Sequence, residues 1–435
     1  MSLISDLKKN DKHGVFSFKN YFTNYSTGFL PLDYINAFKV HYTDADGNDK
    51  VQLLPGVMSG KFITIFGGSG GGKSTLAKQI AYNIIAPFED GILIDVDCEH
   101  ASYKPRIYDI TGFTDDDERY VFNDEDTYIE TVIEEITKIA EAKKAADATY
   151  EVDGKLFGKD KIKMYVPSVV IIDSLPSFVS KDCKFDTLEG QMSNNRETAM
   201  VGQFYKKMLG ICSKFNIIVI AINHLRPRVK TDMFDFSKPQ LMMLKDNECL
   251  PRGEAPIFYA STVLRSNPSA AKSKAFTVED YGFDGFLSTI QVSKTKTTFI
   301  GGEVNLVFRE DKGFDPVYSI YQFAYDSGLF IGANPNLRIK GAEEYKFSKK
   351  NFGEQFENNE EFRTAILGAI QPYLEAIAGC KEDDDVSSNI DASKLFALNS
   401  NGELEPVISE NSKGDIVLTS NTDTDEKPKK SRKIS

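Results

Sequence analysis

One glycine-rich segment constrains the fold of this 435-residue chain more than any other part of it. Residues 67–75 read GGSGGGKST, and they lie between the apolar run FITIF at 62–66 and a helical pattern at roughly 74–86. Glycines let the backbone wrap an anion, so that N–H groups and the positive end of the next helix face a phosphate. A flexible linker would not open a helix directly, so the segment predicts a phosphate-binding loop between a strand and a helix.

The loop also predicts which residues bind a nucleotide. Lys73 is expected to reach the β- and γ-phosphates of ATP or GTP, and the Ser74 hydroxyl is expected to ligate Mg²⁺. The residues expected to contact the nucleotide are Gly67, Gly68, Ser69, Gly70, Gly71, Gly72, Lys73, Ser74 and Thr75.

Three more short apolar runs follow, with the sequences ILIDV at 92–96, VVII at 169–172 and IIVIAI at 217–222. Uninterrupted runs of this length are typical of strands that are buried on both faces. Helical patterns at roughly 125–146 and 197–214 alternate with these runs. The alternation predicts an α/β fold with a parallel sheet and right-handed crossovers. The apolar runs after residue 255 predict further strands, as an antiparallel continuation.

Polar residues stand directly after each of these strands. Glu99 follows the second strand, Asp173 ends the third, and the pair Asn223-His224 follows the fourth. Each one alone could be a turn residue or a helix cap. In a parallel sheet, however, the carboxyl ends of the strands form one edge, where ligands bind. Asp173 suits a contact with Mg²⁺, and Glu99 suits the base that orients an attacking water, so the set predicts a nucleotide hydrolysis site.

The order of these motifs resembles the RecA-type strand-exchange recombinases, and specifically the branch found in large tailed phages. The resemblance covers about residues 25–330, and its motifs are STGFLPLD, the phosphate loop, IDVDCEH, VVIIDS, IAINH and the later pair of lysines in KTK. It implies a RecA-type P-loop NTPase core, in which a mostly parallel sheet is flanked by helices. The expected divisions are an N-terminal segment and candidate protomer contact (1–55), the ATPase core with DNA-binding loops (56–330), a C-terminal helical region (331–380) and a disordered acidic tail with a basic end (381–435).

The resemblance also implies roles for single residues. Glu99 falls on the family's catalytic carboxylate, acting with Lys73, and Asp173 on the acidic residue that assists Mg²⁺. His224 falls on the sensor of the γ-phosphate, where the bacterial pattern has Gln. Lys294 and Lys296 match a lysine pair that reaches a neighbour's nucleotide across the filament interface, with a solvated strand edge as the alternative.

The position of the family's adenine-stacking tyrosine is Arg106 in this chain. A guanidinium can also stack on a base. Tyr103 and Tyr108 are close by, so the stacking residue stays open between these side chains.

Two stretches match the loops with which RecA-type proteins grip DNA, namely 181–197 and 225–254. We call them the first and second candidate DNA loops. The alternative for the second loop is an ordinary mobile surface loop. The second is long and basic and carries apolar residues that could stack between bases. The residues expected to bind DNA are Arg196, Arg226, Arg228, Lys230, Lys245 and Arg252.

The net charge of −12 argues against a nucleic-acid-binding protein only when it is taken as an average. Residues 114–153 contain 14 acidic and 4 basic residues, and residues 381–426 contain 12 acidic and 3 basic residues. The rest of the chain therefore has a net charge of +7, and it holds the phosphate loop and both candidate DNA loops. We expect the acidic tail to compete with DNA for these loops.

The sequence thus predicts an ATP-dependent DNA recombinase, with ATP and Mg²⁺ as ligands, that polymerises on single-stranded DNA and pairs it with a homologous duplex. The alternatives are a hexameric helicase-type motor and a regulatory ATPase that acts through protein partners. A single-strand-binding protein and a loader protein are expected by family analogy only. Five widely spaced cysteines and the lack of a signal peptide or long apolar stretch predict a cytoplasmic protein with no membrane contact, in the host of a phage.

Overall fold

The computed structural model describes residues 21–43, 47–183, 190–228, 241, 243–268, 275–297, 300–381 and 384–388, and four two-residue strands beyond them. Those four strands are β23 (Ala397–Leu398), β24 (Leu404–Glu405), β25 (Ser409–Glu410) and β26 (Ile416–Val417). Among the described residues, none of the helices has the length and apolar character that crossing a membrane requires.

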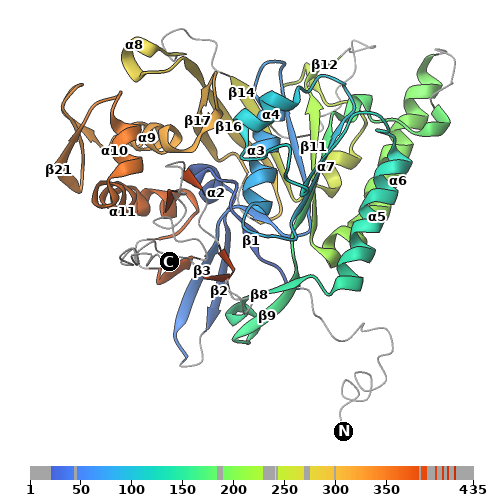
Figure 1. Cartoon of the computed structure of the whole chain (residues 1–435), viewed down its shortest axis with the longest axis horizontal. Coiled ribbons are helices and arrows are strands. Elements are labelled where there is room, and N and C mark those ends of the chain that lie inside the picture. Colours follow the sequence, from blue (N-terminus) through green and yellow to red (C-terminus); the bar gives the residue numbers. More distant parts are fainter. Residues whose placement is uncertain are drawn as a thin grey trace, which may run out of the picture.

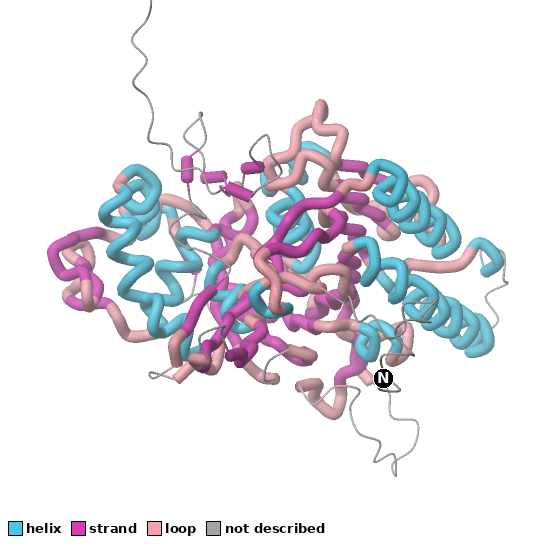
Figure 2. The backbone as a smooth tube through the Cα atoms, turned by 90° about the horizontal axis from the view of Figure 1, so that it is seen from below, coloured by secondary structure: helices cyan, strands magenta, loops and turns pink. Residues whose placement is uncertain are grey.

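A ten-stranded sheet forms the centre of the molecule (Figures 1 and 2), and the α/β fold predicted from the sequence is confirmed. Parallel pairing joins six strands in the order β14 (Thr262–Pro268), β5 (Phe62–Gly67), β11 (Ile217–His224), β10 (Ser168–Asp173), β6 (Ile92–Asp97) and β7 (Tyr120–Asn123). Antiparallel pairing continues the sheet beyond β14 with β16 (Gly285–Thr295), β17 (Glu303–Arg309) and β18 (Gly313–Asp315), while β15 (Ala275–Phe276) pairs with β16.

Helices cover both faces of this sheet. The helices of this part are α3 (Lys73–Ile85), α4 (Lys104–Ile110), α5 (Ile129–Ala146), α6 (Gly190–Phe215), α7 (Ala255–Tyr259), α8 (Val278–Tyr281) and α9 (Pro316–Asp326). Helices α5 and α6 lie side by side at the right of Figure 1, and α3 lies on the opposite face. In β11, Ile218, Ile220 and Ile222 pack with α3, whereas Ile217 and Val219 pack with α5 and α6. Both faces of the strand are therefore buried, which explains its uninterrupted apolar run.

The N-terminal part folds against the core and does not stand alone. Its elements are β1 (Asn24–Tyr25), α2 (Leu30–Ile35), β2 (Phe38–Thr43), β3 (Asp49–Leu54) and β4 (Val57–Met58). The buried Asp33 carboxylate accepts hydrogen bonds from the Ser26 hydroxyl and, at 2.7 Å, from the Thr27 backbone N–H, which fixes the turn before α2. Helix α2 then packs against α9 and against helix α11 (Glu360–Ile377).

Residues 331–380, for which the sequence predicts helices, form a small sheet followed by two helices. The sheet holds β19 (Phe330–Ile331), β20 (Leu337–Ile339) and β21 (Ala342–Phe347), and the helices are α10 (Phe352–Asn358) and α11 (Glu360–Ile377). The tight turn between β20 and β21 contains Gly341 with φ of +89°. This unit shares one apolar core with α2 and α9, and it lies at the left of Figure 1.

One strand lies within the segment 381–435, for which the sequence predicts a disordered acidic tail. Strand β22 (Val386–Ser388) pairs parallel to β3, which in turn pairs with β2. Lys39 pairs with Asp384 at 3.0 Å, and Lys50 pairs with Asp385. Two acidic residues of the predicted disordered tail thus pair with two lysines of the β2–β3 hairpin.

Two further two-stranded sheets lie outside the central sheet. One is the hairpin of β8 (Thr149–Asp153) and β9 (Lys161–Tyr165), and the other is an antiparallel pair of β12 (Arg226–Pro227) and β13 (Glu248–Cys249), which are far apart in the sequence. Single turns of 3-10 helix occupy Lys155–Phe157, Leu175–Ser177 and Lys181–Cys183.

Candidate functional site

The glycine-rich segment 67–75, which we call the glycine loop, connects β5 to α3 and is shaped by close contacts. A Cβ atom on Gly67 would lie 2.2 Å from the Ser266 carbonyl oxygen, and one on Gly72 would lie 2.9 Å from the Phe314 ring. A side chain at either position would therefore require its neighbours to move. Lys73, the first residue of α3, folds back over the loop and donates from Nζ to the Gly68 carbonyl at 2.8 Å.

Four neighbouring strands end at the same edge of the sheet as this loop. His224 pairs with Gly67 in the ladder between β11 and β5, and Asp173 pairs with Asp97 in the ladder between β10 and β6. The structure therefore brings together the polar residues that the sequence places after separate strands. Asp97 itself is buried and accepts bonds from the backbone of the loop that carries Glu99.

Two side chains from different strands hold the Glu99 carboxylate. The Ser174 hydroxyl, directly after β10, donates to Glu99 Oε1. The His224 imidazole, at the end of β11, lies with its Nε2 2.8 Å from the same oxygen. The Glu99 side chain is 34% exposed and His224 27% exposed, so the carboxylate is fixed in position yet open to a ligand.

The charged groups around the glycine loop influence one another. Burial raises the pKa of the Asp173 carboxyl, against the effects of the Lys78 charge and of a hydrogen bond with Ser74. Burial likewise lowers the pKa of the Lys73 ammonium, and the charges of Asp173 and Glu99 oppose that shift. The ammonium, the hydroxyl and both carboxylates thus share one electrostatic environment.

The donors available for a metal at this edge are few. The described part of the chain contains no group of three or more His, Cys, Asp or Glu side chains that could hold an ion alone. Ser74 and Asp173 are joined by a hydrogen bond and supply one hydroxyl and one carboxylate. This set fits Mg²⁺, which is usually held by one or two protein groups together with phosphate oxygens and water.

The sequence reasoning missed a buried ion pair behind the site. Lys78 on α3 contacts Asp95 in β6 at 2.6 Å, and their side chains are 5% and 0% exposed. The Tyr120 hydroxyl donates to the same carboxylate at 3.0 Å. Burial alone would lower the pKa of Lys78, but the charges of Asp95 and Asp173 outweigh it and raise the pKa. The sequence does contain a signal for this pair, namely Asp95 inside the apolar run ILIDV. A buried carboxylate needs a buried partner, so its presence there predicts one.

The candidate base-stacking residues lie around α4. Arg106 donates from Nη1 to the Asp311 carbonyl at 2.6 Å, next to the turn that holds Gly313. A Cβ atom on Gly313 would lie 2.7 Å from Thr75, so this turn also borders the glycine loop. Tyr103 precedes α4 and is 70% exposed, whereas the Tyr108 hydroxyl donates to Asp115 at 2.7 Å.

Lys294 and Lys296 lie at the opposite end of the strands from the glycine loop. Thr295 pairs with Thr262, and Thr262 pairs with Ile63 near the beginning of β5. Lys294 Nζ donates to the carbonyls of residues 257, 258 and 260, the last two at 2.9 and 3.1 Å. Burial and the nearby Lys296 lower the pKa of Lys294 to about 8.

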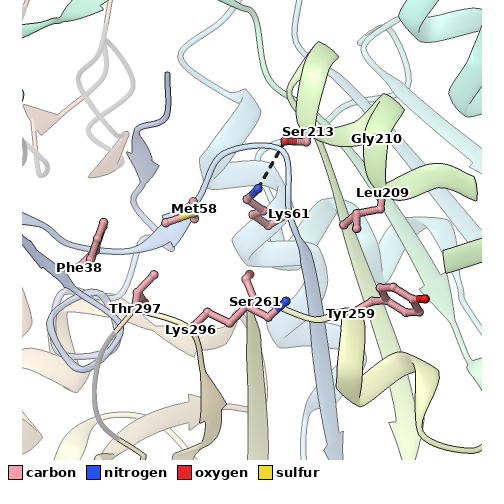
Figure 3. Close-up of a pocket in the computed structure, with 10 residues that line it drawn as sticks. All are labelled: Phe38, Met58, Lys61, Leu209, Gly210, Ser213, Tyr259, Ser261, Lys296 and Thr297. Atoms are coloured by element: carbon pink, nitrogen blue, oxygen red, sulfur yellow. Dashed lines mark hydrogen bonds between the residues drawn. The ribbon is translucent and has the colours of Figure 1, made fainter. Parts of the chain in front are cut away.

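Lys296 lines a pocket of about 480 Å³ at this end of the strands (Figure 3). Lys61 enters the same pocket, where its Nζ donates to Ser213 Oγ at 3.4 Å. Burial, and then the Lys296 charge, lower the pKa of Lys61. Neither Lys294 nor Lys296 therefore lies near the glycine loop of its own chain.

The predicted DNA-binding residues fall into two groups. Arg196, Arg226 and Lys245 are exposed, and Arg228 is partly buried. The Arg252 side chain is 9% exposed and pairs with Glu197, and this ion pair distinguishes Arg252 from the other four. Lys230 lies outside the described residues, as does much of each candidate DNA loop.

The chain is similar in sequence to several proteins named RecA. No protein-family model matches the chain. It is 29% identical over 265 residues to Protein RecA of Syntrophus aciditrophicus, covering 59% of this chain and 62% of that protein. It is also 27% identical over 262 residues to Protein RecA of Clostridium botulinum (strain Eklund 17B), covering 59% and 60%, and 29% identical over 215 residues to Protein RecA of Geobacter sulfurreducens, covering 48% and 50%. This weak homology supports a RecA-like family.

The fold agrees with that family. A large, mostly parallel sheet flanked by helices is consistent with a RecA-like core. The chain spans between half and about 62% of the length of these curated relatives.

Proposed function

We propose that this protein is an ATP-dependent DNA recombinase, which polymerises on single-stranded DNA, pairs it with a homologous duplex and hydrolyses ATP. The observation that carries the proposal is the Glu99 carboxylate, held by Ser174 and His224 at the sheet edge that also bears the glycine loop. The similarity to proteins named RecA supports the same function.

The chemistry follows from the positions of these groups. Lys73 and the N–H groups of the glycine loop would bind the β- and γ-phosphates of ATP, and Ser74 and Asp173 would hold Mg²⁺, which neutralises phosphate charge. Glu99 would orient the attacking water, because Ser174 and His224 leave its second oxygen, Oε2, without a bond to either of them. Replacement of Gly68 by the γ-phosphate as the partner of Lys73 would couple binding to closure of the loop.

The same proposal extends to assembly and to DNA. Lys294 and Lys296 lie at the end of the strands opposite the glycine loop, so they would meet a nucleotide only if it belonged to a neighbouring molecule. Arg196, Arg226, Arg228, Lys230 and Lys245 would contact DNA phosphates. The tailed-phage branch, a host cytoplasm, a single-strand-binding protein and a loader protein are proposed from the resemblance alone.

The test is ATP hydrolysis by the full chain with and without single-stranded DNA, with parallel electron microscopy. We expect DNA to stimulate hydrolysis and to carry helical filaments. Glu99→Gln should lower turnover by about a hundredfold or more and leave ATP-bound filaments on DNA. Normal turnover in this variant would show that Glu99 is not the base. Rings that unwind a forked duplex would favour a helicase-type motor, and the absence of any DNA response would exclude both functions.

A further inference from the structure

The Arg252 side chain joins three segments that are far apart in the sequence. Its guanidinium pairs with the Glu197 carboxylate, donates from Nε to the Leu175 carbonyl at 3.1 Å, and donates from Nη2 to the Pro176 carbonyl. The Arg252 and Glu197 side chains are 9% and 16% exposed. Arg252 lies near the end of the second candidate DNA loop, and Glu197 ends the first. We call these four residues the Arg252 clamp.

The backbone around Arg252 is also held in place. Arg252 has φ of +67° and Gly253 has φ of +73°, and the first of these is an uncommon conformation for a residue with a long side chain. A Cβ atom on Gly253 would lie 2.7 Å from the Thr198 methyl carbon, so this turn sits directly on α6. The Pro251 carbonyl accepts a bond from Asn223 Nδ2 at 3.1 Å.

Two of these contacts, at Leu175 and at Asn223, lie next to the residues that hold Glu99. Ser174, which donates to Glu99 Oε1, immediately precedes Leu175 of the clamp. His224, whose Nε2 lies 2.8 Å from the same oxygen, immediately follows Asn223. The end of the second candidate DNA loop is thus one residue away from each of the two side chains that fix the carboxylate.

We propose that Arg252 is a positioning residue that couples both candidate DNA loops to Glu99. Separating one partner of a buried ion pair leaves an unpaired charge, which is strongly unfavourable, so the clamp moves as a unit. A shift of either loop would then displace Leu175 and Pro176, and through Ser174 the carboxylate. The inference rests on the proposed function, in which DNA binds these loops and hydrolysis depends on Glu99.

The experiment compares Arg252→Gln, Arg252→Lys and Glu197→Gln with the wild-type full chain. The readout is the ratio of ATP turnover at saturating single-stranded DNA to turnover without DNA, together with DNA affinity at several salt concentrations and a thermal melt. We expect Arg252→Gln and Glu197→Gln each to lower the ratio about tenfold. Arg252→Lys, which keeps the charge, should lower it less.

A matched control is Arg119→Gln. Arg119 also pairs with a carboxylate, on Asp117, and donates to two carbonyls at 3.2 Å, but it lies at the opposite end of the parallel strands. This variant should keep the wild-type ratio. If Arg252→Gln does not fold, Arg252→Lys and Glu197→Gln carry the test.

Two results would overturn the clamp. The first is a wild-type ratio in both Arg252→Gln and Glu197→Gln. The second is a direct DNA contact, in which Arg252→Gln weakens binding and lowers the salt slope by about one, while Glu197→Gln leaves stimulation intact. A wild-type chain that DNA does not stimulate would instead overturn the proposed function.

Discussion

Gly70 and Gly72 both have φ of +74° but differ in their surroundings. A Cβ atom on Gly72 would lie 2.9 Å from the Phe314 ring, whereas one on Gly70 would meet nothing within 4 Å. Gly70→Ala should therefore lose about 1 kcal/mol of unfolding free energy from backbone strain alone. Gly72→Ala should lose about 1–3 kcal/mol more, because the ring must move.

Chemical denaturation without nucleotide measures both changes, and Gly70→Ala serves as the control for strain. If both variants lost the same unfolding free energy, the Phe314 ring would be able to move away without cost. The contact would then not be what requires glycine at position 72.

Individual residues differ in how far the sequence could place them. Glu99, Asp173 and His224 could be placed because each follows a buried strand, and parallel strands end at one edge. The sequence predicts that Arg252 contacts DNA, and it does not predict that the Arg252 side chain pairs with Glu197 and is only 9% exposed. Periodicity and spacing carry no information on which basic residue of a long loop has a carboxylate partner 55 residues away.

At the scale of single elements, the pairing of strand β22 with β3 can be tested directly. Its pairing brings Asp384 and Asp385 to Lys39 and Lys50, and the Val51 N–H donates to the Asp385 carbonyl at 3.0 Å. The double variant Asp384→Asn/Asp385→Asn should exchange the amide hydrogens of β3 faster, by up to about fivefold at low salt. The difference should shrink as salt is added, since exposed ion pairs are screened.

Hydrogen exchange followed by mass spectrometry measures this effect. The control is Asp153→Asn, which breaks an exposed pair with Lys155 in a different hairpin. Unchanged exchange in β3 of the double variant would mean that backbone pairing alone holds β22.

Elements with long apolar runs were predictable, and short polar ones were not. Strand β11 is buried on both faces and is apolar from Ile217 to Ile222. Strand β21 reads AEEYKF and is buried only at its two ends, so its pattern lacks such a run. It forms because β20 and α11 supply the apolar surface on which those two ends pack.

At the scale of the whole molecule, the glycine loop and Lys296 lie at opposite ends of the strands of one sheet. If the lysine acts on a neighbour's nucleotide, Lys73→Ala and Lys296→Ala chains should each be inactive alone and should hydrolyse ATP when mixed. In a random equal mixture, about a quarter of the head-to-tail interfaces would combine an intact loop with an intact lysine. We therefore expect about a quarter of the wild-type rate.

ATP turnover with single-stranded DNA measures this complementation, with each variant alone as its control. A mixture that stays inactive, although both variants co-assemble, would contradict action across the interface. It would leave Lys296 as a solvated residue at the end of a strand.

The pairing of β22 with β3 has a consequence for synthesis of the chain. Gln52 in β3 and its partner Ser387 in β22 are separated by 335 residues. At roughly 5–20 residues per second, a ribosome needs about 15–70 s to make the intervening chain. During that time one edge of the nascent β2–β3 hairpin has no native partner, and an unpaired edge invites pairing with other chains. Strand β22, which is made only after the whole central sheet, thus closes an edge that the early β2–β3 hairpin leaves open.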